Sequence, residues 1–217
     1  PEVRSRMILD LHTHSIASDD GRAKVENYCQ WIDRKQLPLD GFVLTEHRQF
    51  DDANDYRALE DKFGIVILKA SEVETEYGHV LVFGVNDDLR AAFDFTKIDN
   101  PLAMVLAEAE RCGAVAVPCH PGRPKVGMCA HWETKGPVEG VHTIETLNGG
   151  SRDDEDALAA SFATRFGWRA IGGSDSHVVS HIGRCATRFE DEIRNIDGLV
   201  TALRGGRFEA IRPDTGA

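Results

Sequence analysis

Short runs of β-type residues alternate along this chain with amphipathic segments of helix length, and this order constrains the fold more than any other feature. Strands are expected over residues 6–12, 39–47, 64–74, 78–85, 114–120, 142–148, 168–177 and 185–190. Helices are expected over residues 25–35, 54–63, 101–112, 154–166 and 196–204. Strands that are repeatedly followed by helices predict an α/β fold with a mostly parallel sheet or barrel. Functional side chains in such folds gather at the C-terminal strand ends.

The length of 217 residues fits one domain, because 41% of the residues are hydrophobic and can fill one sizeable core. The sequence shows no repeat, linker or low-complexity tract that would divide it. We therefore expect a single domain over residues 1–217, with a flexible leader at 1–5 and a flexible tail at 212–217.

The charge balance argues against polymeric anions as partners. Acidic residues outnumber basic ones by 36 to 25, giving a net charge of -11, so no overall field attracts nucleic acid or an anionic membrane.

The five cysteines form no CxxC pair, which indicates neither a disulfide framework nor a thiolate zinc site. With no apolar run of about 18 residues and no apolar stretch at the start, a cytoplasmic location is expected.

Residues of metal-ligand type stand at or near the ends of most expected strands. They are His12, His14, His47, Glu72, His79, His120, Asp175 and His177. In an extended segment residues i and i+2 share a face, so His12 and His14 point the same way, as do Asp175 and His177. Imidazoles mixed with carboxylates suit zinc, iron or manganese, and neighbouring ions of this kind suit hydrolysis of a phosphate ester. Neither a GxSxG elbow nor a P-loop offers a rival mechanism.

Five segments carry these residues in order across residues 10–177: DLHTHSIASDDG, TEH, SEVETEYGHVLVFG, CHPGRP and GGSDSH. They resemble the successive motifs of the polymerase and histidinol phosphatase (PHP) family in its metal-dependent phosphoesterase branch, and the following HIGRCATRF resembles the continuation. The resemblance implies a distorted (β/α)7-type barrel with a metal site at the C-terminal strand ends.

The resemblance also implies a role for each ligand, with up to three divalent metal ions bound. His12, His14, Glu72 and Asp175 would bind the first ion; Glu72, His79 and His120 the second; Asp19, His47 and His177 the third. Glu72 would bridge two ions, so that Glu72 and Asp175 are central to catalysis.

The chain departs from the family pattern at three places. It has Ser18-Asp19-Asp20-Gly21 where the family has SDG, Glu46 in place of an Asp, and Ser71 in place of a Gly. Either Asp19 or Asp20 can then be the ligand, and the spacing from His14 favours Asp19. Glu46 is expected to orient a ligand.

Four further residues are candidates around the metals. Arg123 and Arg184 can hold a substrate phosphate through paired charge-assisted hydrogen bonds, although surface arginines are common. His181 can protonate the leaving oxygen, with a solvent-exposed loop histidine as the equally good alternative. Asn148 can contact substrate, although Asn before Gly-Gly is more often a turn residue.

The leading hypothesis is hydrolysis of a small phosphorylated metabolite by a metal-activated water. The substrate would be a phosphomonoester, such as a nucleotide or histidinol phosphate, or a small phosphodiester. The alternatives are a nuclease that processes nucleic acid, which the acidic balance disfavours, and a catalytically silent metal-binding module. The sequence does not set an oligomeric state.

Overall fold

Strands and helical segments alternate through residues 6–214, the part of the chain that the computed structural model describes. The strands are β1 (Met7–Thr13), β2 (Gly41–His47), β3 (Val66–Thr75), β4 (Gly78–Phe83), β5 (Val115–Pro118), β6 (Thr143–Asn148), β7 (Arg169–Gly173), β8 (Ala186–Phe189) and β9 (Phe208–Ile211). The helices are α1 (Val25–Lys35), α2 (Arg57–Phe63), α3 (Asp87–Ala92), α4 (Leu102–Arg111), α5 (Met128–Lys135), α6 (Asp153–Phe166) and α7 (Ile196–Gly205), with a short 3₁₀ helix, η1, at Val179–His181.

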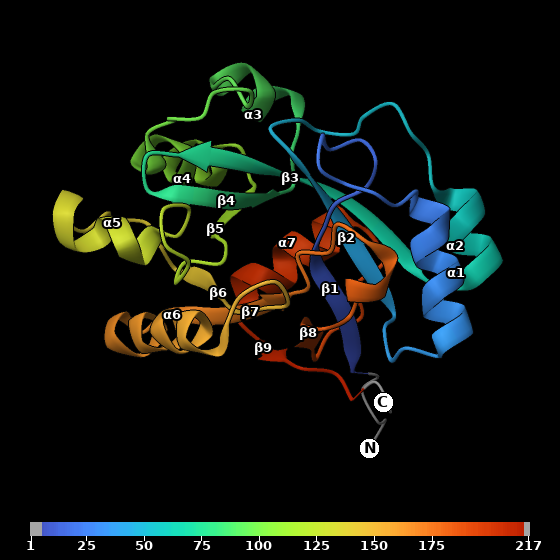
Figure 1. Cartoon of the computed structure of the whole chain (residues 1–217). Coiled ribbons are helices and arrows are strands. Elements are labelled where there is room, and N and C mark those ends of the chain that lie inside the picture. The colour runs from blue at the N-terminus through green and yellow to red at the C-terminus, as the bar shows by residue number, and fades with distance from the viewer. Residues whose placement is uncertain (1–5, 215–217) are drawn as a thin grey trace.

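The strands form two sheets that together make a distorted barrel (Figure 1). The larger sheet has the order β5-β4-β3-β2-β1-β8-β9, and β6 pairs with β7 in the smaller one. β7 packs against β1 and β9, and β6 contacts β5, so the small sheet lies between the edges of the large one. The predicted distorted barrel is confirmed.

Antiparallel pairs explain why the barrel is not a regular repeat. β1, β2 and β3 are parallel, as are β6 and β7. The pairs β3-β4, β4-β5, β1-β8 and β8-β9 are antiparallel. Because β4 runs against β3, the start of β4 lies at the same edge as the ends of β1, β2 and β3.

Apolar side chains fill both the inside of the barrel and the spaces under the helices. Leu9 and Leu11 of β1 lie in a buried cluster with Phe83, Phe189 and Leu199, the last from α7. The pairing of β1 with β2 shifts register between Asp10 and Thr13, close to where the strand ends. His12 and His14 are fully buried at this end of β1, next to the apolar core.

The structure contains three short elements that are not among those expected from the sequence. They are α3, α5 and β9. In α3 the Asn86 side chain accepts a hydrogen bond from the Leu89 N–H, which caps a helix of only six residues.

The chain ends lie partly outside the described residues. Residues 1–5, expected as a leader, and residues 215–217 of the expected tail are outside them. Arg212 of that tail is held in place, because its Nη2 lies 2.6 Å from Asp156 Oδ2. Among the helices of residues 6–214, none combines the length and the apolarity needed to cross a bilayer.

Candidate metal centre

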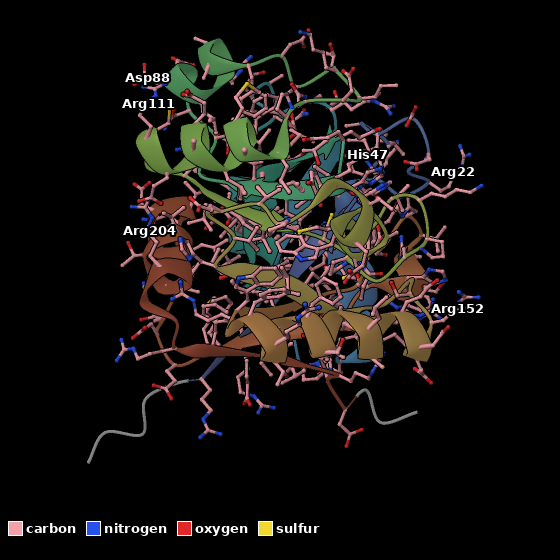
Figure 2. All side chains as sticks on the ribbon, turned by 90° about the vertical axis from the view of Figure 1, so that its left-hand side faces the viewer. Arg22, His47, Asp88, Arg111, Arg152 and Arg204 are labelled. Carbon is pink, nitrogen blue, oxygen red and sulfur yellow. The ribbon has the colours of Figure 1, made fainter. Side chains whose placement is uncertain are left out.

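The residues predicted from strand ends meet at one edge of the barrel. His47 ends β2 and pairs in register with Glu72 of β3, which places the two side chains on the same face of the sheet. His79 stands at the start of the antiparallel β4 and therefore reaches the same edge. Figure 2 shows His47 inside the molecule on the side where Arg22 projects into solvent, with Arg204 on the opposite side.

The Glu72 carboxylate is fully buried at the centre of this edge, and the ring nitrogens of five histidines surround its two oxygens. Nearest Oε1 are His79 Nδ1 at 2.7 Å and His120 Nε2 at 3.2 Å, and nearest Oε2 are His12 Nε2 at 3.1 Å, His14 Nε2 at 3.2 Å and His47 Nδ1 at 3.3 Å. We call Glu72 and these five histidines the Glu72 cluster.

Hydrogen bonds alone do not satisfy the Glu72 cluster. A carboxylate oxygen has two lone pairs and a neutral imidazole has one N–H, yet three ring nitrogens crowd Oε2. Both ring nitrogens of His14 are buried without a hydrogen-bond partner among the described residues, and so is Nδ1 of His120. A divalent cation binds where imidazole nitrogens and carboxylate oxygens with free lone pairs surround one point, so the residues present fit bound metal ions.

The ligand atoms fall into overlapping groups whose members lie within 4.8 Å of one another. These are His12 with Glu72, Cys119 and His120; His14 with His47 and His177; His12 with His14 and Asp175; and His47 with Glu72 and His79. The sequence-predicted ligands, except Asp19, are therefore brought together. Cys119 is an addition to the ligands expected from the sequence.

Asp175 is the second carboxylate of the centre. Its Oδ1 lies 3.4 Å from His12 Nε2 and 3.3 Å from His14 Nε2, while its Oδ2 lies 2.8 Å from Arg123 Nη2. Burial would raise the pKa of Asp175, but the nearby imidazoles, His12 first, hold it well below its usual range. The carboxylate is ready to bind a cation.

Asp20, and not the expected Asp19, faces the third group of ligands. Its Oδ2 lies 3.2 Å from His177 Nε2 and 3.5 Å from His47 Nε2. The Asp19 side chain is 71% exposed and pairs with Arg48 at 3.0 Å. The extra residue in the loop after β1 therefore shifts the inward-facing carboxylate one position along the chain.

Glu145 of β6 supports the centre from behind and was not anticipated from the sequence. It is buried, with Oε1 at 3.1 Å from His12 Nδ1, and its Oε2 accepts hydrogen bonds from the His120 N–H (2.8 Å) and from Asn148 Nδ2 (2.8 Å). A carboxylate on the far ring nitrogen fixes the tautomer and orientation of a metal-binding histidine. The available signal was one acidic residue inside the apolar strand HTIETLN.

Close packing of β7 against β1 brings Glu145 and His12 together. A Cβ on Gly173 would lie 2.4 Å from the His12 Cβ and 2.8 Å from Glu145 Oε1. Only glycine leaves room for this approach. The second glycine of the GGSDSH segment is thus a packing requirement of the metal centre.

Buried charge sets the protonation of the central residues. Burial lowers the pKa of His12, but the carboxylates of Glu145 and Asp175 outweigh it and hold the His12 pKa well above its ordinary value. Burial likewise raises the pKa of Glu72, yet the imidazoles around it, His12 first, keep that pKa well below the usual value. Without metal, the carboxylate of Glu72 therefore stays ionised and His12 favours a bound proton, whereas burial lowers the pKa of His47 and of His120.

Two buried carboxylates anchor the loops that carry ligands. Glu46 accepts hydrogen bonds from the Ser15 N–H (3.1 Å) and from Ser18 Oγ (2.5 Å), and so holds the loop that carries Asp20. Asp10 accepts from the Ser174 N–H at 2.8 Å and from the Gly183 N–H at 2.9 Å. Burial raises the pKa of Asp10 to about 6.

The candidate substrate residues border the centre. Arg123 is partly exposed and donates to Asn148 Oδ1 (2.6 Å) and Ser151 Oγ (2.9 Å) in addition to its pair with Asp175. Arg184 is exposed on the segment after η1. His181 ends η1, and its pKa is lowered by burial and by nearby Arg184.

Comparison with known proteins gives one family match and several relatives. The family model described as PHP-associated matches residues 155–208. A protein of Citrobacter koseri named a probable phosphatase is 26% identical over 231 residues, covering 92% of this chain and 91% of that protein.

Solved structures share the fold. PsfC from Pseudomonas syringae has a TM-score of 0.69 at 19% identity, covering 95% of this chain and 91% of that one. The lesion-specific endonuclease PfuEndoQ from Pyrococcus furiosus has a TM-score of 0.65 at 14% identity, covering 95% of this chain and 58% of that one. Together with the ordered motifs and the clustered ligands, these matches support the assignment of the chain to the PHP family.

Proposed function

We propose that this chain hydrolyses small phosphorylated metabolites with a water activated by two or three divalent metal ions held at the Glu72 cluster. The chain is a phosphoesterase. The substrates that we propose for it are phosphomonoesters, such as nucleotides or histidinol phosphate, or small phosphodiesters. The observation that carries the proposal is one buried carboxylate surrounded by five imidazoles. The probable phosphatase of Citrobacter koseri supports it.

The residues divide among three metal positions, with zinc, manganese or iron as the ions that suit them. His12, His14, Glu72 and Asp175 would hold the first ion; Glu72, His79 and His120 the second; Asp20, His47 and His177 the third. When bound, such ions lower the pKa of a coordinated water and neutralise charge on the phosphoryl group.

The chain's own side chains would position the substrate. Arg123 holds Asp175 with one nitrogen and stands partly exposed beside it, so its guanidinium can also donate to a phosphoryl oxygen. Asn148 keeps Arg123 in this orientation through its 2.6 Å hydrogen bond. Arg184 would reach the same phosphate from the segment after η1.

His181 is the proposed source of a proton for the leaving oxygen. Its lowered pKa makes the protonated ring a stronger acid but reduces its population at neutral pH. The contribution of His181 to turnover should therefore be greatest at mildly acidic pH.

The five free cysteines suit a reducing compartment such as the cytoplasm.

The test is phosphate release from a panel of nucleotides, sugar phosphates, histidinol phosphate and small diesters by the purified chain loaded with manganese, iron or zinc. Glu72→Ala should abolish release, while Glu133→Ala, a change of an exposed glutamate, should leave it intact. Turnover that survives Glu72→Ala would refute the proposal. Full metal loading without any turnover would point to a catalytically silent module.

Nucleic-acid cleavage is the second candidate, favoured by the likeness to the endonuclease from Pyrococcus furiosus. The net charge of -11 opposes it, because binding to nucleic acid depends on neutralising phosphates with Lys and Arg. Metal-dependent cleavage of an oligonucleotide, with binding that weakens steeply as salt rises, would favour this candidate over metabolite hydrolysis.

A further inference from the structure

A thiol lies inside the metal centre. Cys119 follows β5 directly, is fully buried, and places its Sγ 3.4 Å from Glu72 Oε1 and 3.5 Å from His120 Nε2. It belongs to the group of four ligand atoms, with His12, Glu72 and His120, that lie within 4.8 Å of one another. The sulfur lies 3.4 Å from the Glu72 carboxylate, just beyond the 2.7–3.3 Å of the five ring nitrogens.

The backbone explains how two consecutive residues reach the same point. Neighbouring side chains of an extended strand face opposite ways. His120 breaks this alternation with a φ of 31°, in the left-handed region that non-glycine residues seldom adopt. The Cys119 N–H donates to the His79 carbonyl at 3.1 Å, and the His120 N–H donates to Glu145 at 2.8 Å, so other residues of the centre fix this turn.

The spacing of the ligand atoms is that of a metal site. Bond lengths of about 2.3 Å to sulfur and about 2.0–2.2 Å to nitrogen or oxygen give tetrahedral edges of roughly 3.6 Å from sulfur and roughly 3.4 Å between nitrogen and oxygen. The corresponding distances are 3.4 and 3.5 Å from Cys119 Sγ, and 3.2 Å between His120 Nε2 and Glu72 Oε1. All three distances are slightly shorter than these edges, so a small outward movement of the side chains would make room for the ion.

We propose that Cys119 is a direct ligand of the metal ion held by Glu72 and His120, so that this position selects a thiophilic divalent ion. The thiol proton passes to solvent as the sulfur binds. Soft sulfur ligands favour zinc or ferrous iron over manganese or magnesium. The inference rests on the proposed metal centre, although it does not depend on which phosphoester is the substrate.

The experiment is cobalt(II) spectroscopy of the full chain after removal of native metal. Cobalt bound by nitrogen and oxygen shows visible ligand-field bands, and a direct bond to sulfur adds a near-ultraviolet charge-transfer band. We expect both features in the wild type and in Cys129→Ser, which changes a buried thiol of α5. Cys119→Ser should keep the visible bands and lose the charge-transfer band.

Competition between metals gives a second measurement. Cys119→Ser should lower the affinity for zinc by more than about tenfold, because losing a residue that only hydrogen-bonds to a metal ligand already costs about 10–100-fold. The affinity for manganese should fall much less. Visible bands without a charge-transfer band in the wild type would overturn the role of Cys119 and leave it as a hydrogen-bond donor to Glu72. Absence of all cobalt bands would overturn the metal centre itself, and the proposed function with it.

Discussion

Replacing Glu145 by glutamine would test whether the centre depends on this buried carboxylate. Glu145→Gln keeps the shape of the side chain but turns one acceptor oxygen into a donor. Glu145 Oε1 faces His12 Nδ1, while Oε2 accepts from the His120 N–H and from Asn148. An amide has only one oxygen, so it cannot accept hydrogen bonds both from His12 and from the two donors at Oε2.

Either orientation of the amide has a cost that follows from these contacts. If its NH2 group faces His12 Nδ1, the ring proton must move to Nε2, the nitrogen that points at Glu72 and Asp175 and would bind metal. If its NH2 group faces the other way, it meets two donors and leaves buried N–H groups unsatisfied, at about 1–3 kcal/mol. The first outcome should weaken metal binding by about 10–100-fold, the range for losing such a partner, or about 1.4–2.8 kcal/mol.

Two measurements separate the two outcomes. Competition with a coloured chelator measures the metal affinity, and unfolding of the metal-free chain in denaturant measures the cost of the unsatisfied N–H groups. Glu133→Gln is the matched control, because it makes the same chemical change at an exposed position on α5. If Glu145→Gln binds metal and unfolds as the wild type does, then Glu145 neither orients His12 nor supports the His120 backbone, and the reasoning fails.

Three further outcomes are expected. Asp20→Ala should lower the metal bound per chain by about one ion in elemental analysis, whereas Asp19→Ala should not; the reverse result would restore Asp19 as the ligand. Tyr28→Phe removes a buried hydroxyl that donates to two main-chain carbonyls beside the ligands, and should cost about 1–2 kcal/mol of unfolding free energy and weaken metal binding. Tyr77→Phe, which loses a similar bond away from the centre, should not change metal affinity. Because burial raises the pKa of Asp10 to about 6, its contribution to stability is complete below about pH 4 and lost as pH rises through 6, by up to roughly 3 kcal/mol. Asp10→Asn should flatten this fall in denaturant titrations of the metal-free chain, and an unchanged slope would contradict the assignment.

The sequence predicted the strands that carry ligands because their signal is strong and local. His12 and His14 sit two residues apart after an apolar run, and their shared face follows from strand geometry alone. By contrast, α3 depends on a single cap at Asn86, and periodicity over six residues is too short to detect. The order of the strands in the sheet could not be predicted from hydrophobic periodicity either, because the antiparallel pairing of β4 depends on tertiary packing.

The site residues that the sequence missed are those whose role depends on backbone direction or on distant strands. Spacing from His14 favoured Asp19, but the loop held by Glu46 turns Asp20 inward. Cys119 and His120 are neighbours in sequence that reach the same centre, and His120 adopts a left-handed φ there. Glu145 acts across 133 residues of sequence on His12, a separation that no local motif reports.

The division of the barrel into two sheets has a consequence for the life of the protein in a cell. The larger sheet supplies Glu72 and most of the imidazoles, whereas Asp175 and His177 follow β7 of the smaller sheet. An ion bound between them joins the sheets, and any ligand that binds only the folded state adds its binding free energy to stability. Proteases degrade chains that open transiently, so scarcity of metal would shorten the lifetime of the chain as well as its activity. Its abundance would then follow the supply of metal.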